Sequence, residues 1–362
     1  MTSLPFDLDA AVARIKYFET IAHPPEQCWY GLDLALKQWA GLPPAIPVLL
    51  TTHHGIELMV EEMPTYIGNK NPIIVAREDY RKLYQEKYGK QAFRAGNSYV
   101  LYRRTNNIGL APDARGTLAF PAHSTHHITA EFDVDGYIGQ LLALPEAFQP
   151  VSVCLYWKDI LLGRDKLFRN RDIPVYTAGH MFDPLFHKTL YTILRNFRYT
   201  TSNNILVSNA VLSLEMGQTS FYLGERLIYT TEGADPNRQV REQDEMSIFL
   251  ASKDPLAQEY YELFPRYRPG MGPEDLAPCP RLREIISIMH GADENHDPAM
   301  IRSVIFQAFT RFHPKGKAML AIVLENIRLL QTGQYEAVFA DQPEMLDFCR
   351  AICRHPQMVF PS

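Results

Sequence analysis

The chain has 362 residues, which is too long for one ordinary hydrophobic core and suits two domains with some additional helix. Hydrophobic residues make up 46% and charged residues 21%, which is ordinary globular usage and excludes wholesale disorder. The net charge of −5 argues against a general nucleic-acid-binding protein, which usually carries a basic excess.

Cysteine usage and the start of the chain favour a cytoplasmic protein. The five cysteines are scattered and include no CxxC pair, so we interpret them as reduced thiols rather than disulfides or zinc ligands. Residues 1–13 lack the apolar core of a signal peptide, and no run approaches the ~20 apolar residues of a membrane-spanning helix. Peripheral contact with the inner face of a membrane stays open.

The first part of the chain has an irregular α/β pattern, which predicts one domain over residues 1–112. Its end is placed in residues 103–115, because their Asn, Gly, Pro and Asp content is typical of a linker. The expected elements are strands over residues 47–52, 72–76 and 99–102 and a helix over residues 78–88.

Five strand-like runs follow, and helical patterns separate them. The runs cover residues 116–123, 151–157, 174–178, 199–201 and 218–223, and the helical patterns cover residues 135–144, 164–170, 184–197 and 204–216. This alternation predicts a doubly wound parallel sheet in a domain of residues 113–235. The carboxyl ends of its strands share one edge, where such sheets bind ligands.

The last part of the chain reads as helical from about Ile228 onward. Helical spacing recurs over residues 281–290, 300–311 and 317–331. We therefore expect a helical region over residues 236–362 that packs on the two domains.

The polar run after the fourth strand is the clearest candidate ligand site. Thr201, Ser202, Asn203 and Asn204 are expected to open a helix, where hydroxyls, amides and free backbone N–H groups suit a phosphate. Simple N-capping by Ser202 or Asn203 is the alternative.

Further candidates follow the other strands of this predicted sheet. His123, Ser124 and Thr125 follow the first strand, and Tyr156 follows the second, where its ring could stack on a base. Gly179 and His180 follow the third strand and could meet a base or a sugar hydroxyl. A buried structural histidine and a tyrosine packed into the core are the alternative interpretations.

A histidine-rich stretch superficially resembles a metal cluster. His123, His126 and His127 precede Glu131, and on a helix only His127 and Glu131 would share a face. No matching set of ligands stands elsewhere in a recognisable motif. We expect neither a metal nor another cofactor.

His53 and His54 follow a strand of the first domain. A neutral imidazole there could remove the proton from an acceptor hydroxyl, so both are candidate general bases. A structural pair before the turn residue Gly55 is the alternative.

Residues 116–224 resemble the GT-B glycosyltransferases and, more loosely, the UDP-sugar 2-epimerases. The resemblance rests on Phe-Pro-Ala-His-Ser at 120–124, Val-Tyr-Thr-Ala-Gly-His at 175–180, Tyr-Thr-Thr-Ser-Asn-Asn at 199–204 and Glu-Met-Gly at 215–217. The run is similar to enzymes of bacterial surface-polysaccharide assembly, including the sialyltransferase-like group, in which a Ser/Thr cluster holds the donor phosphate.

This resemblance implies two Rossmann-like domains with a nucleotide-sugar in the cleft between them. The donor would lie on the second domain and a glycan or lipid-linked acceptor on the first, with no nucleic-acid partner. Such enzymes need no metal, because helix dipole and side chains stabilise the leaving phosphate. A sugar-nucleotide epimerase and a catalytically silent relative that binds a glycan or a partner are the alternatives.

Overall fold

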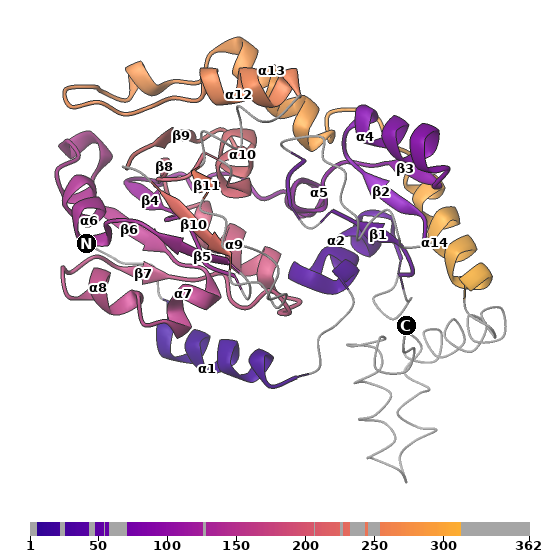
Figure 1. Ribbon diagram of the computed structural model, residues 1–362, viewed down its shortest axis with the longest axis horizontal. Coiled ribbons are helices and arrows are strands. Elements are labelled where there is room, and N and C mark those ends of the chain that lie inside the picture. The colour runs from indigo at the N-terminus through magenta and orange to yellow at the C-terminus, as the bar shows by residue number, and fades with distance from the viewer. Residues whose placement is uncertain are drawn as a thin grey trace, which may run out of the picture. The chain divides into compact units, whose positions relative to one another are not determined.

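The computed structural model describes most of the chain, as two compact units (Figure 1). Unit 1 comprises Met1–Ile21, Gly55–Val60 and Asn107–His290, and unit 2 comprises Ala22–His54, Glu61–Asn106 and Gly291–Ser362. Both units are discontinuous in sequence, and the contiguous ranges 1–112, 113–235 and 236–362 stay a prediction. The described residues are 6–21, 26–42, 48–53, 55–57, 71–125, 128–205, 207–224, 227–231, 243–244 and 254–312.

Unit 1 is built on a five-stranded, fully parallel sheet, which confirms the predicted α/β class. The strand order is β7-β6-β4-β8-β9. Thr117 of β4 lies opposite Val151 of β6 on one side and Tyr199 of β8 on the other. The strands are β4 (Thr117–Ala119), β6 (Val151–Cys154), β7 (Val175–Tyr176), β8 (Tyr199–Ser202) and β9 (Thr219–Tyr222).

The order of these strands has one reversal. The chain builds outward from β4 through β6 to β7, and then returns to the other side of β4 to form β8 and β9. The loops after β4 and β8 therefore leave the sheet in opposite directions, and they flank the switch point of the sheet.

Apolar side chains explain why these strands lie in the interior. All four residues of β6 are buried, as is typical of a parallel strand covered on both faces. The helices between the strands pack one apolar face, and α9 buries Phe186, Leu190 and Ile193. These helices are α6 (Val134–Leu142), α7 (Trp157–Leu161), α8 (Asp165–Arg169), α9 (Phe186–Leu194) and α10 (Ser208–Glu215).

A small antiparallel sheet of unit 1 corrects two sequence-based expectations. Its strands are ordered β11-β10-β5, with β5 at Ile128–Glu131, β10 at Ile228–Thr231 and β11 at Gln243–Asp244. The helix considered for His127 and Glu131 is wrong for Glu131, which ends strand β5, and the chain is not yet helical at Ile228. Strands β5 and β10 pair with each other about a hundred residues apart, so this pairing is not visible in the local pattern.

Helices complete unit 1. Helix α12 begins with Pro255 at its first position, and the Asp254 carboxylate accepts hydrogen bonds from the N–H groups of Leu256 and Ala257. The helices outside the five-stranded sheet are α1 (Leu8–Glu19), α12 (Pro255–Leu263) and α13 (Pro280–His290), with short 3₁₀ turns η3 (Glu146–Phe148) and η4 (Glu274–Leu276).

Unit 2 has a parallel sheet of three strands in sequential order. These are β1 (Thr51–Thr52), β2 (Ile73–Val75) and β3 (Ala92–Arg94), in the order β1-β2-β3. Its other elements are η1 (Glu26–Gly31), α2 (Leu32–Trp39), α4 (Glu78–Lys82), the π turn η2 (Leu83–Lys87), α5 (Ser98–Thr105) and α14 (Pro298–Phe312). A cluster with Leu36, Leu50, Ile74 and Ile305 forms its core.

The strand expected over residues 99–102 is wrong, because these residues lie in helix α5. Asn97 caps this helix, and its side-chain oxygen accepts from the N–H of Tyr99 at 3.0 Å. Residues 98–101 are all buried, so the continuous apolar run is that of a covered helix.

The helical end of the chain is described only in part. Helix α14 confirms the helical pattern over residues 300–311, whereas residues 317–331 lie outside the described residues. No helix within the described residues is long and apolar enough to cross a membrane.

Candidate functional site

The candidate site is the carboxyl edge of the unit 1 sheet, between β4 and β8. In doubly wound sheets the loops diverge at the switch point and leave a crevice, where ligands bind. The order β7-β6-β4-β8-β9 matches the first five strands of the nucleotide-binding order 3-2-1-4-5-6. The described strands of unit 2 have no such reversal.

Asn203 joins the two loops of this switch point. Its side-chain oxygen accepts a hydrogen bond from the N–H of Ala122 at 2.7 Å. The residue is 1% exposed, and its Nδ2 is a buried donor with no hydrogen-bond partner among the described residues. Gly224 packs against it, because a Cβ at Gly224 would stand 2.4 Å from the Asn203 Cβ. Asn203 therefore fixes the start of the loop after β4.

His123 is partly exposed in this loop, as is Thr125. Its ring packs against the ring of Tyr156, which follows β6, with the centroids 4.4 Å apart. Burial lowers the pKa of His123 to about 4, so the imidazole is neutral at pH 7. A neutral imidazole has one N–H donor and one acceptor nitrogen, and it suits a polar ligand group.

Ser124 is buried and bonded within the protein. Its N–H faces both carboxylate oxygens of Asp159, at 3.4 and 3.3 Å, and its Oγ accepts from the N–H of Ala130. Burial raises the pKa of Asp159 to about 6, against the opposing effects of Arg164 and Ser124. The neighbouring Thr125 is partly exposed.

The polar run at 201–204 differs from its expected structure. The helix begins at Ser208 rather than at Asn204, so these residues end a strand and form a turn instead of a helix N-terminus. The hydroxyl of Thr201 donates to the carbonyl of Phe221, and the hydroxyl of Ser202 accepts from the N–H of Asn204. All four residues are buried. The local reason is that Ser202 bonds the chain two residues on, which favours a turn over a helix start.

His180 is fully buried, at 0% exposed, and has protein partners on both ring nitrogens. Nδ1 accepts from the N–H of Phe182 at 3.1 Å, which leaves the proton on Nε2 for Glu19 of helix α1 at 2.7 Å. Gly179 is partly exposed and has φ +100°. This arrangement is typical of a histidine that anchors a neighbouring helix.

Helix α1 is held a second time on the same loop. Arg14 donates two hydrogen bonds to the buried carboxylate of Asp183. The loop after β7 is thus covered by α1 and is less open to a ligand than the loop after β4.

The structure therefore sorts the predicted binding residues of unit 1 into two groups. The partly exposed residues, which a ligand can reach, are His123, Thr125, Tyr156 and Gly179. The buried residues, which hold the loops, are Ser124, His180, Thr201, Ser202, Asn203 and Asn204.

The candidate base His53 lies in unit 2, directly after β1. Its Nε2 stands 3.3 Å from the hydroxyl of Tyr84, and its ring meets the ring of Tyr80 edge-on at 4.7 Å. His53 is partly exposed, and His54 lies outside the described residues. The contacts suit a positioned imidazole and a structural one equally.

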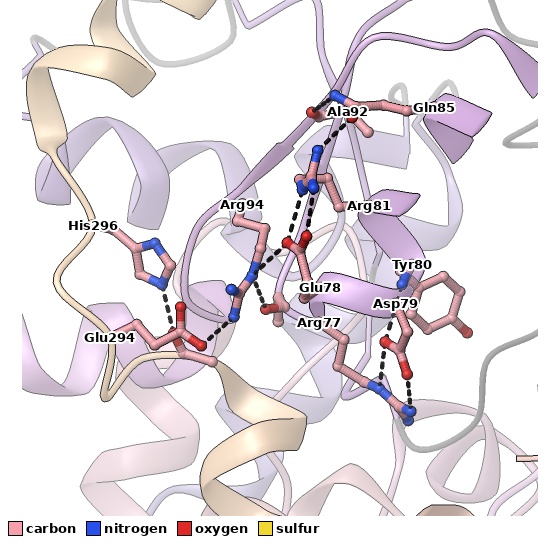
Figure 2. Close-up of polar contacts among 12 residues, drawn as sticks. Arg77, Glu78, Asp79, Tyr80, Arg81, Gln85, Ala92, Arg94, Glu294 and His296 are labelled. Carbon is pink, nitrogen blue, oxygen red and sulfur yellow. Dashed lines mark hydrogen bonds and ion pairs between the residues drawn. The ribbon is translucent and has the colours of Figure 1, made fainter. Parts of the chain in front are cut away.

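Charged side chains after β2 and β3 are paired with one another (Figure 2). Arg77 holds Asp79 with two hydrogen bonds, and Arg94 lies between Glu78 and Glu294. This edge of unit 2 is consequently a network of matched charges.

No group of three His, Cys, Asp or Glu side chains in the described part of the chain could hold a metal ion. His126 and His127 fall outside that part. The expected metal and cofactor independence stays a prediction.

The sequence interpretation missed the residues that support the loop after β4. Asp159 and Arg164 are five residues apart, whereas ion pairs on one helix face are three or four residues apart. They meet because the chain turns at Gly163, whose φ is +75°. Tyr229 of β10, which bonds the amide of Asn204, was missed because β10 was not foreseen. No local pattern signals Asp159, which follows Lys158 in a short helix of mixed composition.

No protein-family model matches this chain, and no curated protein is significantly similar to it in sequence.

Proposed function

We propose that the protein is a glycosyltransferase of the GT-B type, which binds a nucleotide-sugar at the switch point of unit 1 and transfers the sugar to a glycan or related acceptor. The observation that carries the proposal is the reversal of strand order at β4 and β8, with the polar loops at 120–125 and 203–205 on either side. The loop after β4 is held at this point by hydrogen bonds from its backbone to the side chains of Asn203 and Asp159.

The partly exposed side chains define how a donor would be held. His123 and Tyr156 offer a neutral imidazole and an aromatic face, and Thr125 adds a hydroxyl next to them. A nucleotide has a stackable base and several hydrogen-bonding groups, which suit these side chains. We propose that His53 or His54 of unit 2 accepts the proton of the acceptor hydroxyl.

A thermal-shift panel with UDP, GDP, CDP and CMP tests donor binding. One of these nucleotides should raise the melting temperature, since a ligand at 100 times its Kd stabilises by about 2.7 kcal/mol. His123→Ala should weaken that nucleotide's affinity at least tenfold. His296→Ala, which removes a unit 2 histidine bonded to the carbonyl of Gly291, is the matched control and should bind normally.

Turnover then separates the reaction classes. A transferase should hydrolyse the matching nucleotide-sugar slowly and release nucleotide faster when an acceptor is added. Sugar release with nucleotide and no transfer would instead indicate epimerase-type elimination. No nucleotide binding by the folded protein would refute the proposal.

A further inference from the structure

Four groups around the loop after β4 form a closed circuit of hydrogen bonds, which we call the clasp. The carboxylate of Asp159 accepts from the N–H of Ser124 and pairs with Arg164 Nη1 at 2.9 Å. Arg164 Nη2 donates to the carbonyl of Ala130 at 2.6 Å, and the N–H of Ala130 donates to the Ser124 hydroxyl at 3.2 Å. The clasp joins helix α7, the turn after it, strand β5 and the loop after β4.

The clasp contains an ion pair that is mostly buried. Asp159 is 2% exposed, and the Arg164 side chain is mostly covered, with its guanidinium 5.8 Å from the ring centroid of Phe132. Desolvating two charges often costs as much as their attraction returns, so a buried pair is weak evidence for stability alone. It does impose one arrangement on the backbone groups that it binds.

The backbone group held by the clasp is next to His123. Ser124 follows His123 and is bound by Asp159, while Ala122 precedes it and is bound by Asn203. Both bonds are buried. The chain on either side of His123 is thus fixed, and its imidazole, packed on Tyr156, is partly exposed for contact with a ligand.

We propose that Asp159 and Arg164 are positioning residues, which hold His123 at the switch point with its ring packed on Tyr156 for contact with the donor. Contact with a nucleotide-sugar rests on the function proposed above, whereas the positioning of His123 does not. Neither residue of the clasp is assigned a contact with the ligand.

The experiment is a titration of the histidine rings by NMR in the full-length protein, with the His123 signal assigned from the spectrum of His123→Gln. In the unchanged protein the His123 signal should not titrate above pH 5. In Asp159→Asn, whose neutral amide cannot form an ion pair with Arg164 and has one acceptor oxygen instead of two, the loop should loosen and the pKa of His123 should rise by at least one unit. Losing a nearby negative charge would by itself lower that pKa, so a rise reports greater access of water to the imidazole.

Two further variants keep the test decisive. Arg164→Lys retains the charge, but a single ammonium cannot bind Asp159 and Ala130 through two separate nitrogens as the guanidinium does. It should raise the pKa of His123 as well, to a smaller extent. Asp165→Asn is the control, because it removes a neighbouring Asp–Arg pair, 3.7 Å apart on helix α8, and should leave His123 unchanged. Folded Asp159→Asn and Arg164→Lys proteins with an unshifted His123 would overturn the proposal.

Nucleotide affinity gives the second readout. Asp159→Asn should lose about as much affinity as His123→Gln, at least tenfold, and the double variant should be within twofold of His123→Gln. Full additivity of the two losses would contradict positioning through His123. If no nucleotide binds the unchanged protein, the proposed function fails while the NMR result still decides the role of the clasp.

Discussion

His123 and Ser124 are neighbours in the chain with opposite environments. The imidazole of His123 is partly exposed at the switch point, whereas Ser124 is enclosed by Asp159 and Ala130. The same division separates Tyr156, at the surface, from the fully buried Trp157 next to it. Neighbouring residues after a strand therefore have different environments: one side chain is partly exposed at the carboxyl edge of the sheet, and the next is buried beneath it.

Residue chemistry also leads to a prediction for the histidines after β1. His53→Ala or His54→Ala should lower turnover by about 10²–10⁴, which is the usual loss when a positioned base is removed. Donor affinity should be nearly unchanged, because the base acts on the acceptor. Initial rates at saturating donor, with a nucleotide titration beside them, measure both quantities.

The control for this prediction is Tyr84→Phe, which removes only the hydroxyl that faces His53 Nε2. If His53 is structural, the His53→Ala protein should be less stable, and its rate per folded molecule should be unchanged. Full activity of both single variants would remove these histidines from the mechanism.

At the scale of elements, the site depends on how closely the turn after β8 and the end of β9 approach each other. Gly224 follows β9 with φ +147°, a conformation that side chains other than glycine rarely adopt. A Cβ there would overlap the Cβ of Asn203, whose amide oxygen holds Ala122. The absence of a side chain at Gly224, after β9, thus leaves room for Asn203, which in turn holds the loop after β4, two strands away in the sheet.

Gly224→Ala should therefore destabilise the protein by about 2 kcal/mol and weaken nucleotide binding as well. Urea denaturation measures the first effect, and the nucleotide thermal shift measures the second. The matched control is Gly217→Ala, where φ is +89° but no atom lies within 4 Å of the added Cβ. It should show the backbone strain alone, with nucleotide affinity intact; equal effects of both changes would contradict the role given to Asn203.

At the scale of the whole molecule, the two parallel sheets differ in topology. The unit 1 sheet reverses its strand order and has a switch point, whereas the described strands of unit 2 follow one another in sequence. The carboxyl edge of unit 2 carries His53 and the ion pairs of Arg94 with Glu78 and Glu294, and that of unit 1 carries the neutral imidazole of His123 and buried polar side chains of the loops. The reversal of strand order is therefore the feature that favours unit 1 as the donor-binding unit of the proposed function.

Hydrogen exchange followed by mass spectrometry should show which unit binds the nucleotide. The nucleotide identified by thermal shift should slow exchange in residues 120–125 and 203–205, because a bound ligand suppresses local opening. Residues 73–105 of unit 2 should exchange at the same rate with and without nucleotide. Protection confined to unit 2 would move the donor site out of unit 1.

Sequence patterns predicted the sheet of unit 1 well because its strands are short apolar runs between amphipathic helices. Those signals are local, and β6 and α9 formed within a few residues of their expected ranges. Sequence patterns failed where a strand pairs with a segment far along the chain, and where an N-cap residue makes an apolar run helical. Strand β5 pairs with β10 far along the chain, and Asn97 makes residues 98–105 a helix.

Sequence by itself determined the α/β class, the parallel alternation of unit 1 and the polar residues that follow its strands, because periodicity and strand-end chemistry are properties of short segments. Only the tertiary structure decided which of those residues are exposed. The strand order set the switch point beside His123, the turn at Gly163 brought Arg164 to Asp159, and burial of residues 201–204 made them supports for the loops. Exposure depends on packing between segments distant in the chain, and no local pattern records it.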